Sequence, residues 1–345
     1  RYLALDLETT GLYEGEIRCI GFSDGERNLV VDKSTNIFWD EMMNNYFLAN
    51  PVKKCAFNSQ FDRRWLVKEF EAEPLNLNYD PILMHYILDE NKPHDLETVA
   101  HDLTGARPWK LTHELKEGET WASVPFERLA QHCGEDCWHT HKVLLECLKC
   151  IKESGHKDKL LYFYNKILLP TSIMCSRYEA RGLKIDKAYA HAVAEKFQKE
   201  NDKTFKEISS LDAVKNYVRQ KSAANKKFAF NLNSPQQVAE ILYKRLKLPI
   251  LRDRRTEQVT INKKAIVIYK GKHPFVDKYM AWNDKETLMG SYLRKFPAMA
   301  GLFDGLIHPS FNPCFQVTGR VSVSNPPAAN VPRDSEVRGM ITSRF

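Results

Sequence analysis

The sequence lacks the features that mark membrane and secreted proteins. It contains no run of about eighteen or more apolar residues, so no segment is predicted to span a bilayer. The first residues lack the charged-then-apolar layout of a signal peptide, and residue 1 already lies in a strand-like run, which leaves open that the natural start is missing. Eight cysteines among 345 residues do not suggest a disulfide scaffold and fit an intracellular, reduced protein better.

Internal repeats and low-complexity tracts are also absent, but the charge is distributed unevenly. The chain carries a net charge of +7. Residues 1–160 hold 19 Lys and Arg against 28 Asp and Glu, a net −9, whereas residues 161–345 hold 32 against 16, a net +16. This asymmetry favours an acidic half with a carboxylate-based site and a basic half that binds a polyanion. The alternative is that these charges only cover solvated faces.

Three parts of the chain differ in their expected secondary structure. Residues 1–155 begin with a meander of strands and continue with strand–helix alternation, which predicts a mixed α/β sheet with helices packed on it. Residues 156–300 have a helical spacing of apolar residues and include Lys-rich helices. Residues 301–345 change to short strands and proline-containing turns. We therefore expect domain boundaries near residues 155 and 300.

A pair of acidic residues lies in the short apolar strand near the N-terminus. Asp6 and Glu8 are two residues apart, and a strand places such residues on the same face. Two like charges held together away from water are costly unless a cation joins them, and hard carboxylate oxygens suit Mg²⁺ or Mn²⁺. The alternative is that one of these residues only ends the strand and faces water.

Two further polar groups accompany this pair. Asn58 and Asp62 follow a predicted strand over residues 53–57, with Asp62 on the first turn of the next helix. An Asp there more often interacts with the helix dipole than with a metal, so this signal is weak alone. His132 and Asp136 lie four residues apart and share one helical face if their helix starts early.

Taken together, these residues resemble the motifs of the DEDD superfamily of 3′→5′ exonucleases, which have an RNase H-like fold. Asp6 and Glu8 match the DxE motif, Asn58 and Asp62 match the Nx₃D motif, and Asp136 matches the last acid of the third motif. The resemblance implies two metal ions held by the four acids, with Asp6 between them and a water in line with the last phosphodiester.

The same resemblance assigns residues around the acids. It implies that Leu12 wedges between the last two bases and that Thr9 and Asn58 contact the 3′-terminal nucleotide. The third motif departs from the family, because one branch has Tyr where His132 stands and another has His at a spacing one residue longer. A His there can orient or deprotonate a water near neutral pH. The alternative is a surface histidine with Glu135 in its place.

A zinc site is the competing metal hypothesis for this segment. Soft ligands crowd it, namely Cys133, Cys137, His139, His141, Cys147 and Cys150. They look strung along one helix, so a closed tetrahedral site would need ligands from other elements.

The basic half resembles family A DNA polymerases of the bacterial or phage repair and replication type. Residues 177–186 resemble the entry into the thumb, residues 230–249 the segment that closes it, and residues 318–332 the first motif of the palm. Ala329 stands where the family usually has Gln. The resemblance implies an RNase H-like α/β exonuclease domain over 1–155, a mainly helical thumb over 156–300 and the edge of an α+β palm over 301–345.

This resemblance also implies contacts with DNA. Lys221, Lys226 and Lys227 of the thumb would bind phosphates, which is a contact independent of sequence and sensitive to salt. Thr318 and Arg320 would lie at the primer end, where an Arg in the minor groove can sense the shape of a base pair without reading sequence. For any single Lys, the alternative is a solvated face.

The family's polymerase motifs, namely DxSQxExR, a fingers helix with Lys and Tyr, and a late HDE, do not occur in the sequence. We expect a fragment or one part of a split enzyme, whose palm and fingers a second polypeptide would carry, and no primer extension by this chain alone. The predicted function is a metal-dependent proofreading exonuclease that binds single-stranded 3′ ends and primer–template DNA. Its predicted place is the cytoplasm of a bacterial or phage-infected cell, at the nucleoid through DNA. The alternatives are a DNA-binding scaffold with an inactive nuclease fold and a stand-alone exonuclease acting on RNA.

Overall fold

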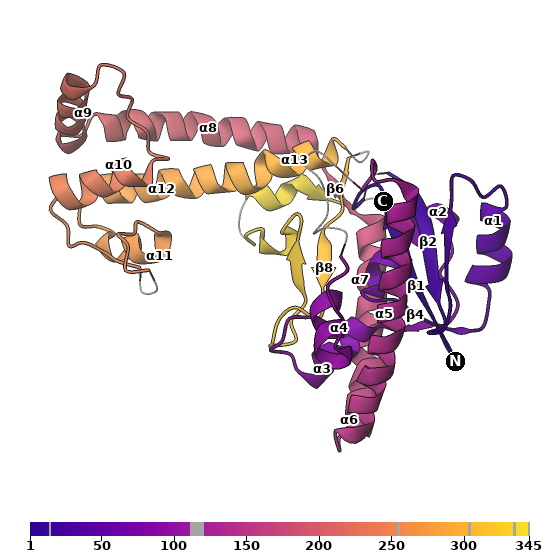
Figure 1. Ribbon diagram of the computed structural model, residues 1–345. Coiled ribbons are helices and arrows are strands. Elements are labelled where there is room, and N and C mark those ends of the chain that lie inside the picture. Colours follow the sequence, from indigo (N-terminus) through magenta and orange to yellow (C-terminus); the bar gives the residue numbers. More distant parts are fainter. Residues whose placement is uncertain (14, 111–120, 254–255, 303–304, 334–335, 344–345) are drawn as a thin grey trace. The chain divides into compact units, whose positions relative to one another are not determined.

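The computed structural model describes residues 1–345 except 14, 111–120, 254–255, 303–304, 334–335 and 344–345 (Figure 1). Its internal contacts divide the chain into two compact units. The first comprises Arg1–Leu183 with Ile307–Asn330, and the second comprises Lys184–Leu306 with Val331–Phe345. The expected domain boundaries near 155 and 300 stay a prediction, because compact units and functional domains are different divisions of a chain.

The first unit contains a five-stranded mixed sheet in the order β3-β2-β1-β4-β5. Its central strand pairs antiparallel with β2 and parallel with β4, so a meander precedes the strand–helix alternation, as the sequence predicts. The last strand is only three residues long, and the sequence analysis missed it. The strands are β1 (Tyr2–Thr9), β2 (Ile17–Ser23), β3 (Asn28–Asp32), β4 (Lys53–Cys55) and β5 (Leu77–Tyr79).

Helices pack on this sheet. The longest, α5, lies across β1, β2 and β3, as the long magenta helix in Figure 1 shows. A π-helical segment connects α6 to α7, next to the Pro170 at which the sequence predicts a kink. The helices are α1 (Trp39–Glu41), η1 (Met42–Leu48), α2 (Ser59–Phe70), α3 (Pro81–Leu88), α4 (Leu96–Thr104), α5 (Phe126–Glu153), α6 (Lys157–Phe163), η3 (Tyr164–Leu168) and α7 (Leu169–Arg181).

The central strand has two buried faces. Leu5 and Leu7 belong to one core with Trp65 of α2, whereas Ala4 belongs to another core, formed largely by α3, α4 and α5. Because side chains alternate along a strand, Asp6 and Glu8 lie on the face that carries Ala4. The fold therefore directs both carboxylates toward α5.

The second unit is mainly helical. Its helices α8 and α12 lie side by side along most of their length (Figure 1). Ser234 caps α10 by accepting a hydrogen bond from the main-chain N–H of Gln237, with Pro235 in the first turn, as the sequence predicts. The helices are α8 (Lys187–Ser209), α9 (Asp212–Ala224), α10 (Pro235–Ala239), η4 (Glu240–Arg245), α11 (Lys263–Ile266), η5 (Val267–Tyr269), α12 (Pro274–Leu288), η6 (Met289–Leu293) and α13 (Lys295–Ala300).

Short strands and 3₁₀ turns complete the chain. In the first unit, β8 (Ser310–Asn312) and β9 (Ser322–Ser324) form an antiparallel hairpin followed by the turn η7 (Ala328–Asn330). A three-stranded sheet has the order β10-β6-β7, with strands at Ile341–Thr342, Leu183–Ile185 and Leu306–Ile307, and η8 (Glu336–Met340) precedes β10. Among the described residues, no helix has both the length and the apolar character that crossing a bilayer requires. The predicted fold class, a mixed α/β sheet followed by a helical region and short strands, is confirmed.

Candidate active site

The polar residues predicted for the first unit meet at one cavity of about 390 Å³. Its wall contains Asp6 and Glu8 from β1, Asp62 from the first turn of α2, and His132 and Asp136 from α5. The structure thus brings together the five predicted catalytic residues, which are spread over more than a third of the sequence. Their roles stay predictions.

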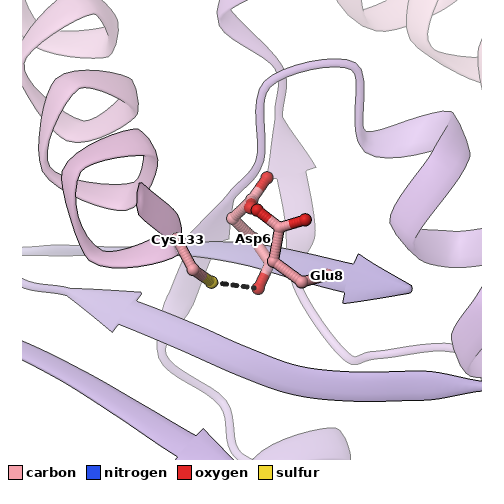
Figure 2. A group of neighbouring side chains, drawn as sticks. All are labelled: Asp6, Glu8 and Cys133. Carbon is pink, nitrogen blue, oxygen red and sulfur yellow. Dashed lines mark hydrogen bonds between the residues drawn. The ribbon is translucent and has the colours of Figure 1, made fainter. Parts of the chain in front are cut away.

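Asp6 and Glu8 lie next to Cys133 of α5, as Figure 2 shows. One potential ligand atom from each of these three residues lies within 4.8 Å of the others. The Cys133 thiol donates a hydrogen bond to the main-chain carbonyl of Asp6, at 3.6 Å. A hydrogen bond with Cys137 raises the pKa of the Cys133 thiol well above its usual range, and burial adds to this shift. Cys133 is therefore a neutral thiol that packs beside the two carboxylates.

The carboxylates of this cavity are crowded and largely removed from water. Burial, and then the negative charge of Asp136, raise the pKa of Asp6 to about 7. Burial, and then the charge of Asp6, raise the pKa values of Glu8 and Asp62 well above their usual range. Within the described part of the chain, Asp62 Oδ1 is buried without a hydrogen-bond partner. A divalent cation with oxygen ligands relieves both the repulsion and the unpaired oxygen, so this donor set fits Mg²⁺ or Mn²⁺.

Two residues that the sequence analysis missed hold Asp136. Trp109 donates a hydrogen bond from Nε1 to one carboxylate oxygen, and Lys110 donates from Nζ to the other. The positive charge of Lys110 opposes the rise in the pKa values of Asp6 and Glu8, because it offsets part of the negative charge of the cavity. Both residues precede α5 in a segment without helical or strand periodicity, so no local pattern indicates that they belong to the site.

His132 is buried at the cavity, with only 5% of its surface exposed. Its Nε2 atom lies 3.7 Å from Glu8 Oε1 and 3.9 Å from Asp136 Oδ2. The ring stacks on Trp121, at 5.5 Å between centroids, and burial lowers the imidazole pKa. His132 is therefore not a surface residue, and the described wall of the cavity contains His132 and not Glu135; which of the two takes part in the reaction stays a prediction.

The three residues expected to contact the terminal nucleotide also line this cavity. Thr9 is buried and donates a hydrogen bond to the carbonyl of Gly11. Asn58 has a left-handed backbone (φ 61°), which Asn tolerates better than most residues, and this turn leads from β4 into α2. Leu12 is 64% exposed at the rim.

The alternative zinc site is not supported. All six of its Cys and His ligands lie on α5, as the spacing predicts. In the described ranges, Asp6, Glu8 and Cys133 are the only group of three metal-binding side chains close enough to share an ion. His139 instead stacks on Trp109, with 3.7 Å between ring centroids.

None of the remaining predicted DNA contacts belongs to the described wall of the cavity. In the second unit, Lys221 pairs with Glu240 at 2.8 Å. The sequence predicts a helix over residues 212–227, but α9 ends at Ala224, so Lys226 and Lys227 are exposed just after the helix. In the first unit, the turn between β8 and β9 exposes two further predicted contacts, Thr318 and Arg320. Their roles stay predictions.

Comparison with known families matches both halves of the chain. The family model described as 3′-5′ exonuclease matches residues 1–149, and the model described as DNA polymerase family A matches residues 190–345.

Curated relatives and a solved structure agree with these matches. DNA polymerase I of Synechocystis sp. is 27% identical over 302 residues, which cover 86% of this chain and 29% of that protein. DNA polymerase I of Borreliella burgdorferi is 23% identical over 358 residues, covering 100% of this chain and 37% of that protein. The chain thus spans about a third of the length of these relatives.

The solved structure is the POL domain of Pol1 from M. smegmatis in complex with DNA primer-template and dNTP. It superimposes with a TM-score of 0.76 at 18% identity over 99% of this chain and 54% of that one, which shows a shared fold. Both family matches, in this order along one chain, confirm the resemblance predicted from the motifs. The chain belongs to DNA polymerase family A, and it carries that family's 3′-5′ exonuclease domain followed by the N-terminal part of its polymerase region.

Proposed function

We propose that the first unit is a metal-dependent 3′→5′ exonuclease that proofreads DNA for a family A polymerase. The observation that carries this proposal is the convergence of Asp6, Glu8, Asp62 and Asp136 from three elements on one cavity. Four acids held together, one of them with a buried oxygen that has no hydrogen-bond partner, destabilise the folded protein. A scaffold without nuclease activity would therefore be more stable if these acids were replaced. The family A match over residues 190–345 disfavours a stand-alone RNA exonuclease.

The four acids are the residues that would hold the Mg²⁺ or Mn²⁺ ions. Bound there, the ions supply positive charge that stabilises the attacking and leaving oxygens of a displacement at phosphorus. The neutral imidazole of His132 can accept a proton from a water in the cavity, with Glu8 beside its Nε2 atom.

The rim residues position the DNA end. Leu12 presents an apolar side chain at the cavity mouth, where it can separate the last two bases. Thr9 and Asn58, whose side chains line the same wall, are placed to contact the terminal nucleotide. The terminal phosphodiester would then lie next to the carboxylates, which is the placement that hydrolysis from a 3′ end requires.

Release of nucleotides from a single-stranded DNA oligonucleotide, labelled near its 5′ end and followed with Mg²⁺ and with EDTA, tests this function. We expect stepwise shortening that EDTA stops, and slower shortening of an RNA oligonucleotide of the same sequence. No shortening of DNA in Mg²⁺ or Mn²⁺ would instead support the inactive scaffold, and faster shortening of RNA would support the RNA alternative.

We also propose that the basic residues after α9 bind the phosphates of primer–template DNA. Lys226 and Lys227 are exposed and adjacent, whereas Lys221 is paired with Glu240. Arg320, exposed in the β8–β9 turn, would contact the primer end. Nucleotide addition would need the family's palm and fingers motifs, which do not occur in these 345 residues.

Replacing Lys226 and Lys227 together with alanine should weaken duplex binding and flatten its salt dependence. Each lysine that neutralises a phosphate contributes about 0.9 to the slope of log K against log salt, so the pair should lower that slope by about 2. Fluorescence anisotropy of a labelled primer–template at several salt concentrations measures it. The matched control replaces Lys196 and Lys285, which are paired with Glu336 and Glu200, and should leave the slope unchanged. Equal slopes for both double variants would contradict this assignment.

A further inference from the structure

The loop that carries Leu12 is fixed by side chains from outside it. We call residues 11–13 the wedge loop. Each of its three consecutive carbonyls accepts a hydrogen bond from a side chain. The donors, in chain order of the carbonyls, are Thr9 Oγ1 at 2.8 Å, Arg64 Nη2 at 2.6 Å and Lys68 Nζ at 2.8 Å. An exposed leucine on a short loop thus has a main chain that is anchored at every residue.

Arg64 is the buried charged residue among these anchors. Its guanidinium uses one arm for the Leu12 carbonyl and another for Glu179 Oε2, at 3.0 Å. Both charged side chains are nearly inaccessible, at 8% and 3% exposure. The guanidinium also lies over the ring of Tyr13, 4.2 Å from its centroid. A planar fork can make these contacts together, whereas a lysine ammonium of similar length cannot.

Glu179 in turn is held in place by groups from two other segments. Its Oε1 atom accepts hydrogen bonds from Gln60 Nε2 at 2.6 Å and from the main-chain N–H of Phe311 at 2.7 Å. Gln60 Nε2 also donates to the Phe311 carbonyl, at 2.6 Å. Helix α2, helix α7 and strand β8 of the first unit therefore meet at one buried carboxylate, which leaves Arg64 little freedom to move.

The wedge loop contacts the same strand directly. The hydroxyl groups of Tyr13 and Ser310 are 2.6 Å apart, and the Tyr13 ring stacks on His308 at 5.6 Å between centroids. The loop is thus anchored to the helix that carries Asp62 and to the β8–β9 hairpin at once.

We propose that Arg64 and Glu179 are positioning residues of the exonuclease, which hold Leu12 rigidly at the cavity mouth so that it can separate the terminal bases. This inference rests on the proposed nuclease function. In this proposal Arg64 acts on Leu12 through the wedge loop, by its hydrogen bond to the Leu12 carbonyl and its contact with the Tyr13 ring. If the main chain of the wedge loop could move, Leu12 could not keep two stacked bases apart. A misplacement of about 1 Å at the reacting end can lower the rate up to about 100-fold.

A double-mutant cycle between Arg64 and Leu12 tests the proposal. We expect R64K and L12A each to lower the rate of nucleotide release from a mismatched 3′ end by about 10- to 100-fold. If Arg64 acts through Leu12, adding R64K to L12A should lower the rate by less than about twofold, because the two changes remove the same contact. R177K is the control, since Arg177 forms an exposed pair with Glu73 in the same unit, and it should keep the parental rate.

The outcomes separate this inference from the function on which it rests. Two results would overturn the positioning role alone. In the first, R64K lowers the rate of nucleotide release of the L12A chain by the same factor as that of the parent chain. In the second, R64K alone keeps the parental rate. A parent chain that releases no nucleotide overturns the exonuclease function and this inference with it. If thermal unfolding shows that R64K does not fold, R64M/E179M enters the same cycle, because replacing both members of a buried ion pair with apolar side chains commonly keeps a fold stable.

Discussion

Replacing Asp6 with alanine should abolish nucleotide release from DNA 3′ ends and leave the fold intact. Asp6 lines the cavity with Glu8 and Asp136 and would be one of the acids that hold the metal ions. Losing that ligand removes several kcal/mol of charge stabilisation, which corresponds to a fall in rate of at least about 10³-fold. The measurement is the rate of DNA shortening in Mg²⁺ beside the melting temperature of each chain.

The melting temperature and a control variant show whether a loss of activity in Asp6→Ala is specific to the site. Burial and the charge of Asp136 disfavour the ionised form of Asp6, so alanine should not lower the melting temperature. Asp40→Ala is the control, because Asp40 is an exposed acid on α1 of the same unit, and it should keep the parental rate. Activity of Asp6→Ala within a few-fold of the parent would remove Asp6 from the proposed site.

The acids of the site could be predicted because local geometry places them. The two-residue period of a strand puts Asp6 and Glu8 on one face, and the first turn of α2 carries Asp62 to the same cavity. The four-residue spacing of His132 and Asp136 puts both on one face of α5. In each case the spacing of residues within one segment predicts which side chains share a face. Only the convergence of the three segments on one cavity had to be inferred from the family resemblance.

Contacts between distant segments could not be predicted in this way. Trp109 and Lys110 reach Asp136 from an irregular segment, and Trp121 stacks on His132 just before α5 begins. None of these side chains lies at a periodic position, so their sequence context resembles that of ordinary surface loops. Their contribution to the charge and shape of the cavity became visible only with the fold.

The same reason explains the missed pairing of Arg64 with Glu179. These residues are 115 positions apart, and each sits in a helix where a solvated charge is the ordinary expectation. Nothing in the order of elements indicates that Ile307–Asn330 packs within the first unit, which is what brings Phe311 to the Glu179 carboxylate. Tertiary packing, rather than local propensity, decides which charges become buried.

The end of helix α9, by contrast, is set by a local contact. Helix α9 stops at Ala224 although helix-forming lysines follow, because Asn225 adopts an extended backbone and its side chain accepts a hydrogen bond from the N–H of Lys227. Lys226 and Lys227 therefore lie in a turn, where their ammonium groups are less constrained than on a helix.

His132→Ala should lower the rate of nucleotide release by about 10²- to 10⁴-fold, the usual contribution of a positioned acid–base residue. The imidazole is buried and neutral, because burial lowers its pKa, and its Nε2 atom points to the carboxylates of Glu8 and Asp136. It is thus placed to orient a water or take its proton. His101→Ala is the control, since His101 is an exposed histidine on α4 and should not affect the rate.

Two further substitutions separate chemistry from packing at this position. His132 stacks on Trp121, so alanine removes a ring as well as a polar nitrogen. Tyrosine and phenylalanine both restore a ring, but only tyrosine offers a hydroxyl that can hold a water, as in the exonuclease branch that has Tyr there. We expect His132→Tyr to be faster than His132→Ala, and His132→Phe to be as slow as His132→Ala although it is as stable as the tyrosine variant. Equal rates for Phe and Tyr would mean that the ring only supports Trp121, and parental rates for all three would remove His132 from the reaction.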